Sequence, residues 1–117
     1  MAIFVKTILS LMLLSSFLIF VKATGSCYAA PDFYGPKCDD TQQTFGGSTV
    51  SYTITPRENA GTMICCKVKG YKNNVETWFD IGCSGAYTLS QTVPWGNSLG
   101  YKGVQCKGIP FGCFVEF

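Results

Sequence analysis

The chain has 117 residues, with 9 Lys and Arg, 7 Asp and Glu, and no histidine. The absence of histidine excludes catalytic and metal sites that depend on an imidazole ring. Lys6 and Lys22 lie in an apolar N-terminal segment, and without that segment 9 − 2 = 7 basic residues balance 7 acidic ones. A net charge of zero argues against a basic nucleic-acid-binding protein and against a cationic membrane-lytic peptide.

Residues 1–23 have the pattern of a secretory signal peptide. A short start with one positive charge precedes the apolar run Ile8–Val21, and small residues follow at Ala23 and Gly25. A membrane-spanning helix needs about 20 apolar residues, so an uncleaved anchor is the less favoured alternative. We expect cleavage after Ala23 or Gly25. The product is a secreted, extracellular protein with one cysteine-rich domain, residues 24–117, that does not insert into a membrane.

The segment 24–47 is expected to be an extended arm, because it contains Pro31, Pro36 and a pair of glycines. Two cysteines, Cys27 and Cys38, are expected to hold it. The next segment, 48–55, alternates cleanly between apolar and hydroxyl side chains and is the clearest half-buried strand.

A second strand is predicted over 62–69, which contains two adjacent cysteines. Side chains alternate along a strand, so Cys65 and Cys66 point in opposite directions. Cys66 is in line with Ile64 and Val68 and is expected to form a core disulfide. Cys65 is in line with two lysines and is our candidate for an odd or intermolecular thiol, which would give a disulfide-linked homodimer. Alternatively, Cys65 ties down a covering loop.

Four more strands are predicted over 75–81, 86–93, 101–107 and 112–117, each with alternating side chains or Gly/Pro turns beside it. In the first of these, Glu76, Trp78 and Asp80 share one face. About six short strands predict an all-β domain, a small disulfide-stabilised antiparallel sandwich or barrel with an extended N-terminal arm.

Seven cysteines in 117 − 23 = 94 residues is a density typical of disulfide-stabilised secreted domains. No C-x-x-C pair occurs, so we expect no metal site and no cofactor. An odd number leaves at least one thiol over in a monomer. The candidates for disulfide bonds are Cys27, Cys38, Cys66, Cys83, Cys106 and Cys113.

Two tryptophans and one arginine are candidates for a binding surface. Trp95 lies in a glycine-flanked loop close to Leu99 and Tyr101, and either anchors an interface or folds back to plug the end of the domain. Trp78, between two acidic residues, suits a sugar-binding strip, the alternatives being an ordinary wet face or a tryptophan covered by the arm. Arg57 lies in a loop near the adjacent cysteines, where a protease inhibitor would present a basic residue.

Catalysis is not expected. Asp39 and Asp40 lie in a polar, solvated stretch. The backbones of Glu76 and Asp80 are about 13 Å apart on one strand, which is too far for a glycosidase pair.

These observations predict a binding protein that acts outside the producing cell on an extracellular protein or glycan. Its general design resembles that of small cysteine-rich proteins secreted as effectors, toxins or defence factors. The alternative functions are a carbohydrate-binding protein that uses an exposed tryptophan, and a protease inhibitor that presents Arg57.

Overall fold

The computed structural model describes residues 25–57, 61–85 and 88–117, so the predicted signal peptide lies outside the described residues. The described part of the chain forms eight strands and no helix, which confirms the all-β prediction. The strands are β1 (Ser26–Pro31), β2 (Cys38–Phe45), β3 (Thr49–Pro56), β4 (Met63–Lys72), β5 (Val75–Ser84), β6 (Leu89–Pro94), β7 (Leu99–Ile109) and β8 (Cys113–Glu116).

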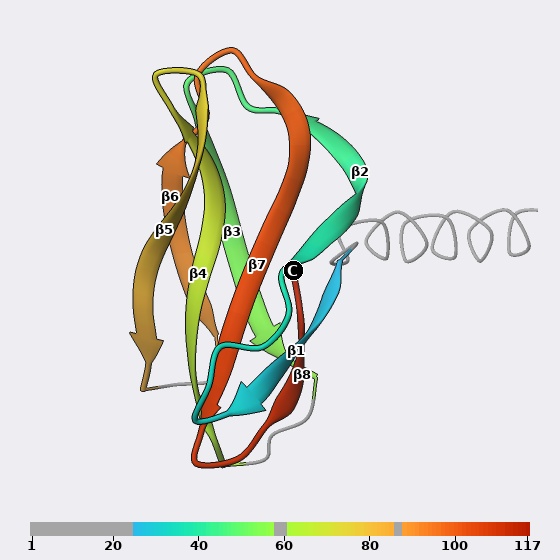
Figure 1. The fold of residues 1–117 in the computed structure, drawn as a ribbon, viewed down its shortest axis with the longest axis vertical. Coiled ribbons are helices and arrows are strands. Elements are labelled where there is room, and N and C mark those ends of the chain that lie inside the picture. The colour runs from blue at the N-terminus through green and yellow to red at the C-terminus, as the bar shows by residue number, and fades with distance from the viewer. Residues whose placement is uncertain (1–24, 58–60, 86–87) are drawn as a thin grey trace, which may run out of the picture.

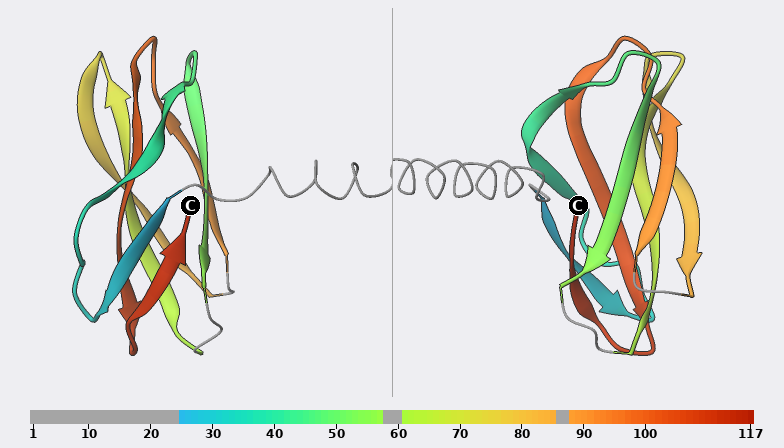
Figure 2. Two further views of the ribbon diagram at one scale, coloured as in Figure 1. Left: turned by 90° about the vertical axis from the view of Figure 1, so that its right-hand side faces the viewer. Right: turned by 180° about the vertical axis from the view of Figure 1, so that it is seen from behind.

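The strands belong to one curved sheet that nearly closes into a barrel (Figure 1). Its main path is β5-β4-β7-β1-β8-β3-β6, and β2 pairs with β7 beside β1. All neighbours are antiparallel except β1 and β7, which share a short parallel contact. The turned views in Figure 2 show the sheet wrapping around, with β3 and β6 on the side opposite β7.

The core lies inside this curved sheet. On β3 the apolar residues Val50, Tyr52 and Ile54 are buried, and the residues between them are exposed, as the alternation predicts. On β6, Leu89 is paired with Ile54 and Val93 with Val50. The other core residues are Cys27, Ala29, Ile64, Cys66, Val68, Trp95, Val104, Cys106, Cys113, Val115 and Phe117.

The N-terminal segment is extended and is held by the Cys27–Cys38 disulfide, as predicted, but it is part of the sheet and not a separate arm. It forms β1, which pairs with β8 and β7, and β2, which pairs with β7. Cys27 and Ala29 of β1 are buried, whereas Ser26 and Tyr28 are exposed, so β1 alternates like the other strands. Its proline, Pro31, stands at the end of the strand, where it leaves the interior ladder intact.

Three disulfides connect the strands: Cys27–Cys38, Cys65–Cys83 and Cys66–Cys106. The prediction that Cys66 forms a core disulfide is confirmed, because Cys66 and Cys106 are both fully buried in the core. The prediction that Cys65 is the odd thiol is wrong. The odd thiol is the buried Cys113. Cys113 was predicted to form a disulfide, and this prediction is also wrong.

A β-bulge in β5 explains why Cys65 meets Cys83. Lys67 pairs with Asp80, and Cys65 pairs with Cys83. Between these two pairs the chain advances by two residues on β4 but by three residues on β5, so β5 contains one extra residue. At this point Gly82 has a φ of 82°, and its amide donates a hydrogen bond to the Asp80 carboxylate at 2.9 Å. The extra residue reverses the alternation and moves Cys83 to the outer face, where Cys65 lies.

Candidate functional site

Trp95 lies in the core and not on the surface. Its ring is fully buried, packs edge-on against Tyr71 with 4.9 Å between the ring centroids, and donates from Nε1 to the Thr44 carbonyl at 3.3 Å. Burial of a large apolar ring is favourable when its single donor has a partner. The prediction that Trp95 belongs to a binding surface is therefore wrong, and the alternative that it plugs one end of the domain is confirmed.

Three large side chains on β2 and β7 form an exposed apolar patch, which consists of Phe45, Leu99 and Tyr101. Their exposed fractions are 65%, 62% and 42%. Phe45 lies directly opposite Leu99, and Gln43 lies opposite Tyr101, so the three side chains share one face of the sheet. Leu99 and Tyr101 were predicted as binding residues. Phe45 was missed, because it belongs to the segment that was expected to be an arm.

Trp78 lies on the outer face of β5 together with Glu76 and Asp80, as the alternation predicts. Its indole reaches across β4 towards β7, where a Cβ atom on Gly103 would lie only 3.0 Å from the ring. The Lys37 ammonium, from the connection between β1 and β2, lies 4.7 Å from the ring centroid. The ring is thus half-buried beside a connection from the N-terminal segment.

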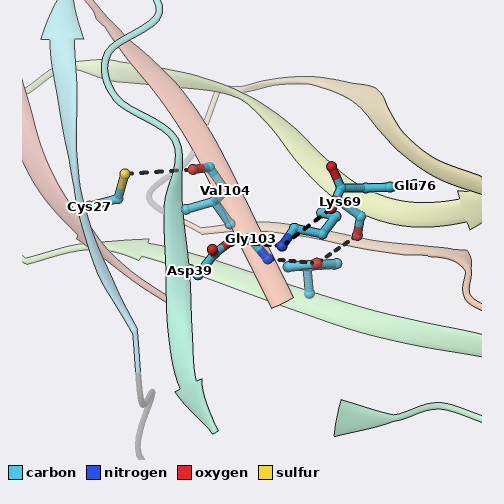
Figure 3. A network of polar contacts seen from close by, with 7 residues as sticks. Cys27, Asp39, Lys69, Glu76, Gly103 and Val104 are labelled. Carbon is cyan, nitrogen blue, oxygen red and sulfur yellow. Dashed lines mark hydrogen bonds and ion pairs between the residues drawn. The ribbon is translucent and has the colours of Figure 1, made fainter. Parts of the chain in front are cut away.

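A charged network ties three strands together on this outer face (Figure 3). Lys69 of β4 is buried, and its ammonium pairs with the Asp39 carboxylate of β2 at 2.8 Å and with the Glu76 carboxylate of β5 at 3.8 Å. Both carboxylates are more than half exposed. The Glu76 carboxylate is therefore paired with the Lys69 ammonium.

The Tyr52 hydroxyl joins β4 to β7 from inside the core. It donates to the Lys69 carbonyl at 2.6 Å and accepts from the Gly103 amide at 3.1 Å. The paired residues of these two strands end at Val68 and Val104, so the hydroxyl bridges the point at which the strands separate. Burial raises the pKa of Tyr52 well above its usual range, although the hydrogen bond from Gly103 acts in the opposite direction.

Arg57 is held against the outer face of β8 and β1. Its Nε pairs with Glu116 at 3.3 Å, one terminal nitrogen donates to the Ser26 hydroxyl at 2.9 Å, and its guanidinium lies 5.4 Å from the Phe114 ring centroid. The Arg57 side chain is about half exposed. Arg57 thus belongs to a small surface cluster with Phe114 and does not project freely from its loop.

The one free thiol among the described residues, Cys113, is buried. Burial raises the pKa of the Cys113 thiol, and the thiolate is the reactive form of cysteine. In the ranges that the structure describes, no group of three or more Cys, Asp or Glu side chains could hold a metal ion.

No protein-family model matches this chain, and no curated protein or solved structure gives a significant match. Within residues 25–57, 61–85 and 88–117, no helix is long and apolar enough to cross a membrane. The proposals below therefore rest on the surface of the protein.

Proposed function

We propose that this protein is secreted and acts outside the producing cell as a binding module for an extracellular protein. Three intramolecular disulfides indicate an oxidising environment, and the N-terminal sequence pattern supports export. The general design is that of small cysteine-rich effectors, toxins and defence factors. No catalytic role is proposed.

The observation that carries this proposal is the apolar patch. Phe45 and Leu99 are each more than 60% exposed, although both are large and apolar. Side-by-side apolar and aromatic residues are typical anchors of protein interfaces. Both residues lie on hydrogen-bonded strands, and the buried Trp95 donates to the carbonyl of Thr44, which precedes Phe45. Little backbone order therefore has to be gained on binding.

Site-specific photo-crosslinking tests the proposal. A photoreactive residue replaces Gln43, which lies beside the patch and leaves its three residues unchanged. A matched control carries the same residue at the exposed Phe111, in the connection between β7 and β8 and at the other end of β7 from the patch. We expect a protein adduct from position 43 and not from position 111 when the module is added to its natural extracellular medium.

The variant Phe45→Ser/Leu99→Ser provides the decisive comparison. It should abolish the adduct and weaken binding to the purified partner at least tenfold, while the thermal unfolding curve shows that the fold is kept. An adduct that survives the double substitution, or no adduct from position 43, would contradict the proposal.

The two alternative functions have less support. A sugar platform built on Trp78 would need the face of its ring to be open, but the ring is half-buried with Lys37 beside it. An inhibitor of trypsin-like proteases needs a projecting basic side chain, but the Arg57 guanidinium is engaged by Glu116 and Ser26. Neither function is proposed for these residues.

A further inference from the structure

One face of the ribbon formed by β3 and β6 consists almost entirely of hydroxyl groups. The outward positions of β3 are all serine or threonine, and so are those of β6 before its final residue, Pro94, together with the residue that precedes β6. We call this surface the hydroxyl ribbon. Its residues, all exposed, are Thr49, Ser51, Thr53, Thr55, Thr88, Ser90 and Thr92.

The hydroxyls are arranged on a regular grid. Thr53 lies opposite Ser90, and Ser51 opposite Thr92. The Ser51 and Thr92 hydroxyls are 3.0 Å apart. Along each strand the hydroxyls repeat about every 6.6–6.8 Å, and the two strands are about 4.7–4.9 Å apart. The threonine side chains are restricted at χ1, so they present their hydroxyl and methyl groups with little loss of freedom on binding.

The ribbon carries no charge. Neither Thr49–Pro56 nor Thr88–Pro94 contains Asp, Glu, Lys or Arg. Lys102 reaches the edge of β3, where its ammonium donates to the Ser51 carbonyl at 2.8 Å.

A shallow depression lies in the middle of the ribbon. It has a volume of about 370 Å³ and is lined by Ser51, Tyr52, Thr53, Ser90, Gln91 and Thr92. This volume is within the range of small-ligand sites, about 300–1,000 Å³. Each hydroxyl can donate one hydrogen bond and accept two, which matches a ligand that is itself covered with hydroxyls.

We infer that the hydroxyl ribbon binds a neutral, extended glycan chain. The repeating grid suits a polymer with repeating hydroxyls, and the threonine methyl groups suit its C–H surfaces. The two strands carry no charged side chain, which favours a neutral ligand over a charged one. This site goes beyond the proposed protein-binding function, since it uses β3 and β6 instead of β2 and β7 (Figure 2).

Co-sedimentation with insoluble polysaccharides tests the inference. The probes are cellulose, chitin and β-1,3-glucan, with heparin-coated beads as an anionic comparison. We expect the wild-type protein to bind at least one neutral polymer. This binding should persist at roughly 1 M salt, where charge interactions are screened within about 3 Å.

Substitutions that remove hydroxyls but keep the strand shape identify the site. The variant Ser51→Ala/Thr53→Val/Ser90→Ala/Thr92→Val should lose at least tenfold in neutral-polymer binding. The control Thr44→Val/Thr77→Val removes two hydroxyls elsewhere and should bind like the wild type. If the fourfold variant fails to fold, the single substitutions Thr53→Val and Thr92→Val should each weaken binding about threefold or more.

Several results would overturn the inference. The inference is wrong if the protein binds none of the three neutral polymers, or if it binds only to heparin. It is also wrong if the fourfold variant and the wild type bind a neutral polymer equally well. The variant Phe45→Ser/Leu99→Ser should keep its glycan binding, so failure of this inference is distinguishable from failure of the proposed protein-binding function.

Discussion

A single hydroxyl group in the core, that of Tyr52, holds together two strands at the point where their ladder ends. It supplies a donor to the Lys69 carbonyl and an acceptor to the Gly103 amide. Both backbone groups would otherwise lose a partner in a buried environment, and an unpaired buried polar group costs about 1–3 kcal/mol. Tyr52 therefore acts as a structural link between β4 and β7 as well as a core residue.

The substitution Tyr52→Phe should lower the free energy of unfolding at neutral pH by about 1–3 kcal/mol, since both partners lose their hydrogen bond. As the pH rises into the alkaline range, the variant should also lose less stability than the wild type does. Burial raises the pKa of Tyr52 in the folded state, so above about pH 10 the unfolded chain releases this proton while the folded protein retains it. Wild-type stability therefore falls with pH in that range.

Urea unfolding of both proteins between pH 7 and roughly pH 11 checks this prediction. The stability difference between wild type and variant should shrink as the pH rises. A difference that stays constant or grows with pH would show that Tyr52 does not hold its proton more tightly in the folded state.

At the scale of one element, the bulge in β5 decides which cysteines meet. Without it, Cys83 would continue the alternation of Phe79 and Ile81, which pack against the core, and would point away from Cys65. The bulge requires a φ of 82° at position 82. Glycine adopts this angle readily, whereas residues with a Cβ atom rarely do. No atom lies within 4 Å of a Cβ placed there, so any penalty of a substitution comes from the backbone.

The substitution Gly82→Ala should destabilise the protein by about 1–2 kcal/mol through this backbone conformation. It should also speed the reduction of the Cys65–Cys83 disulfide relative to the Cys66–Cys106 disulfide, because only the first depends on the bulge. Mass spectrometry after timed reduction and alkylation measures both rates. Gly85→Ala is the matched control, since a Cβ there also meets no atom and φ is not positive. Equal effects of the two substitutions would contradict the role of the bulge.

At the scale of the whole molecule, the disulfides close loops of different length around a small core. The Cys66–Cys106 bond spans 40 residues and lies in the core. The Cys65–Cys83 bond spans 18 residues and joins the fully buried Cys65 to the exposed Cys83 on the outer side of β4 and β5. A longer closed loop restricts the unfolded chain more and so contributes more to stability.

Removing the bonds separately should therefore give unequal losses of stability. From loop length alone, Cys66→Ala/Cys106→Ala should cost about 4 kcal/mol and Cys65→Ala/Cys83→Ala about 3 kcal/mol. The core cavity left by the first pair adds to its cost. Guanidinium unfolding measures both, and a larger loss from the second pair would contradict this order. As a control, the unreduced wild type should take one alkylating label in denaturant, on Cys113.

Much of the fold and part of the candidate site were predictable, because they depend on local alternation. The apolar face of residues 48–55, the outer position of Trp78 and the core position of Cys66 all follow from a period of two along a strand. Leu99 and Tyr101 were recognised as surface candidates from their loop context. The two N-terminal strands were missed, because Pro31, Pro36 and the two glycines of the segment 24–47 were interpreted as signs of irregular structure.

The sequence by itself determined that this protein is an all-β domain with an oxidised cysteine framework, since both properties depend on composition and short-range pattern. The tertiary structure decided which cysteine stays free, that Trp95 is buried, and that Phe45 meets Leu99. Each of these depends on the pairing of distant strands or on one inserted residue in β5. Register between strands is a non-local property that alternation within a single strand does not specify.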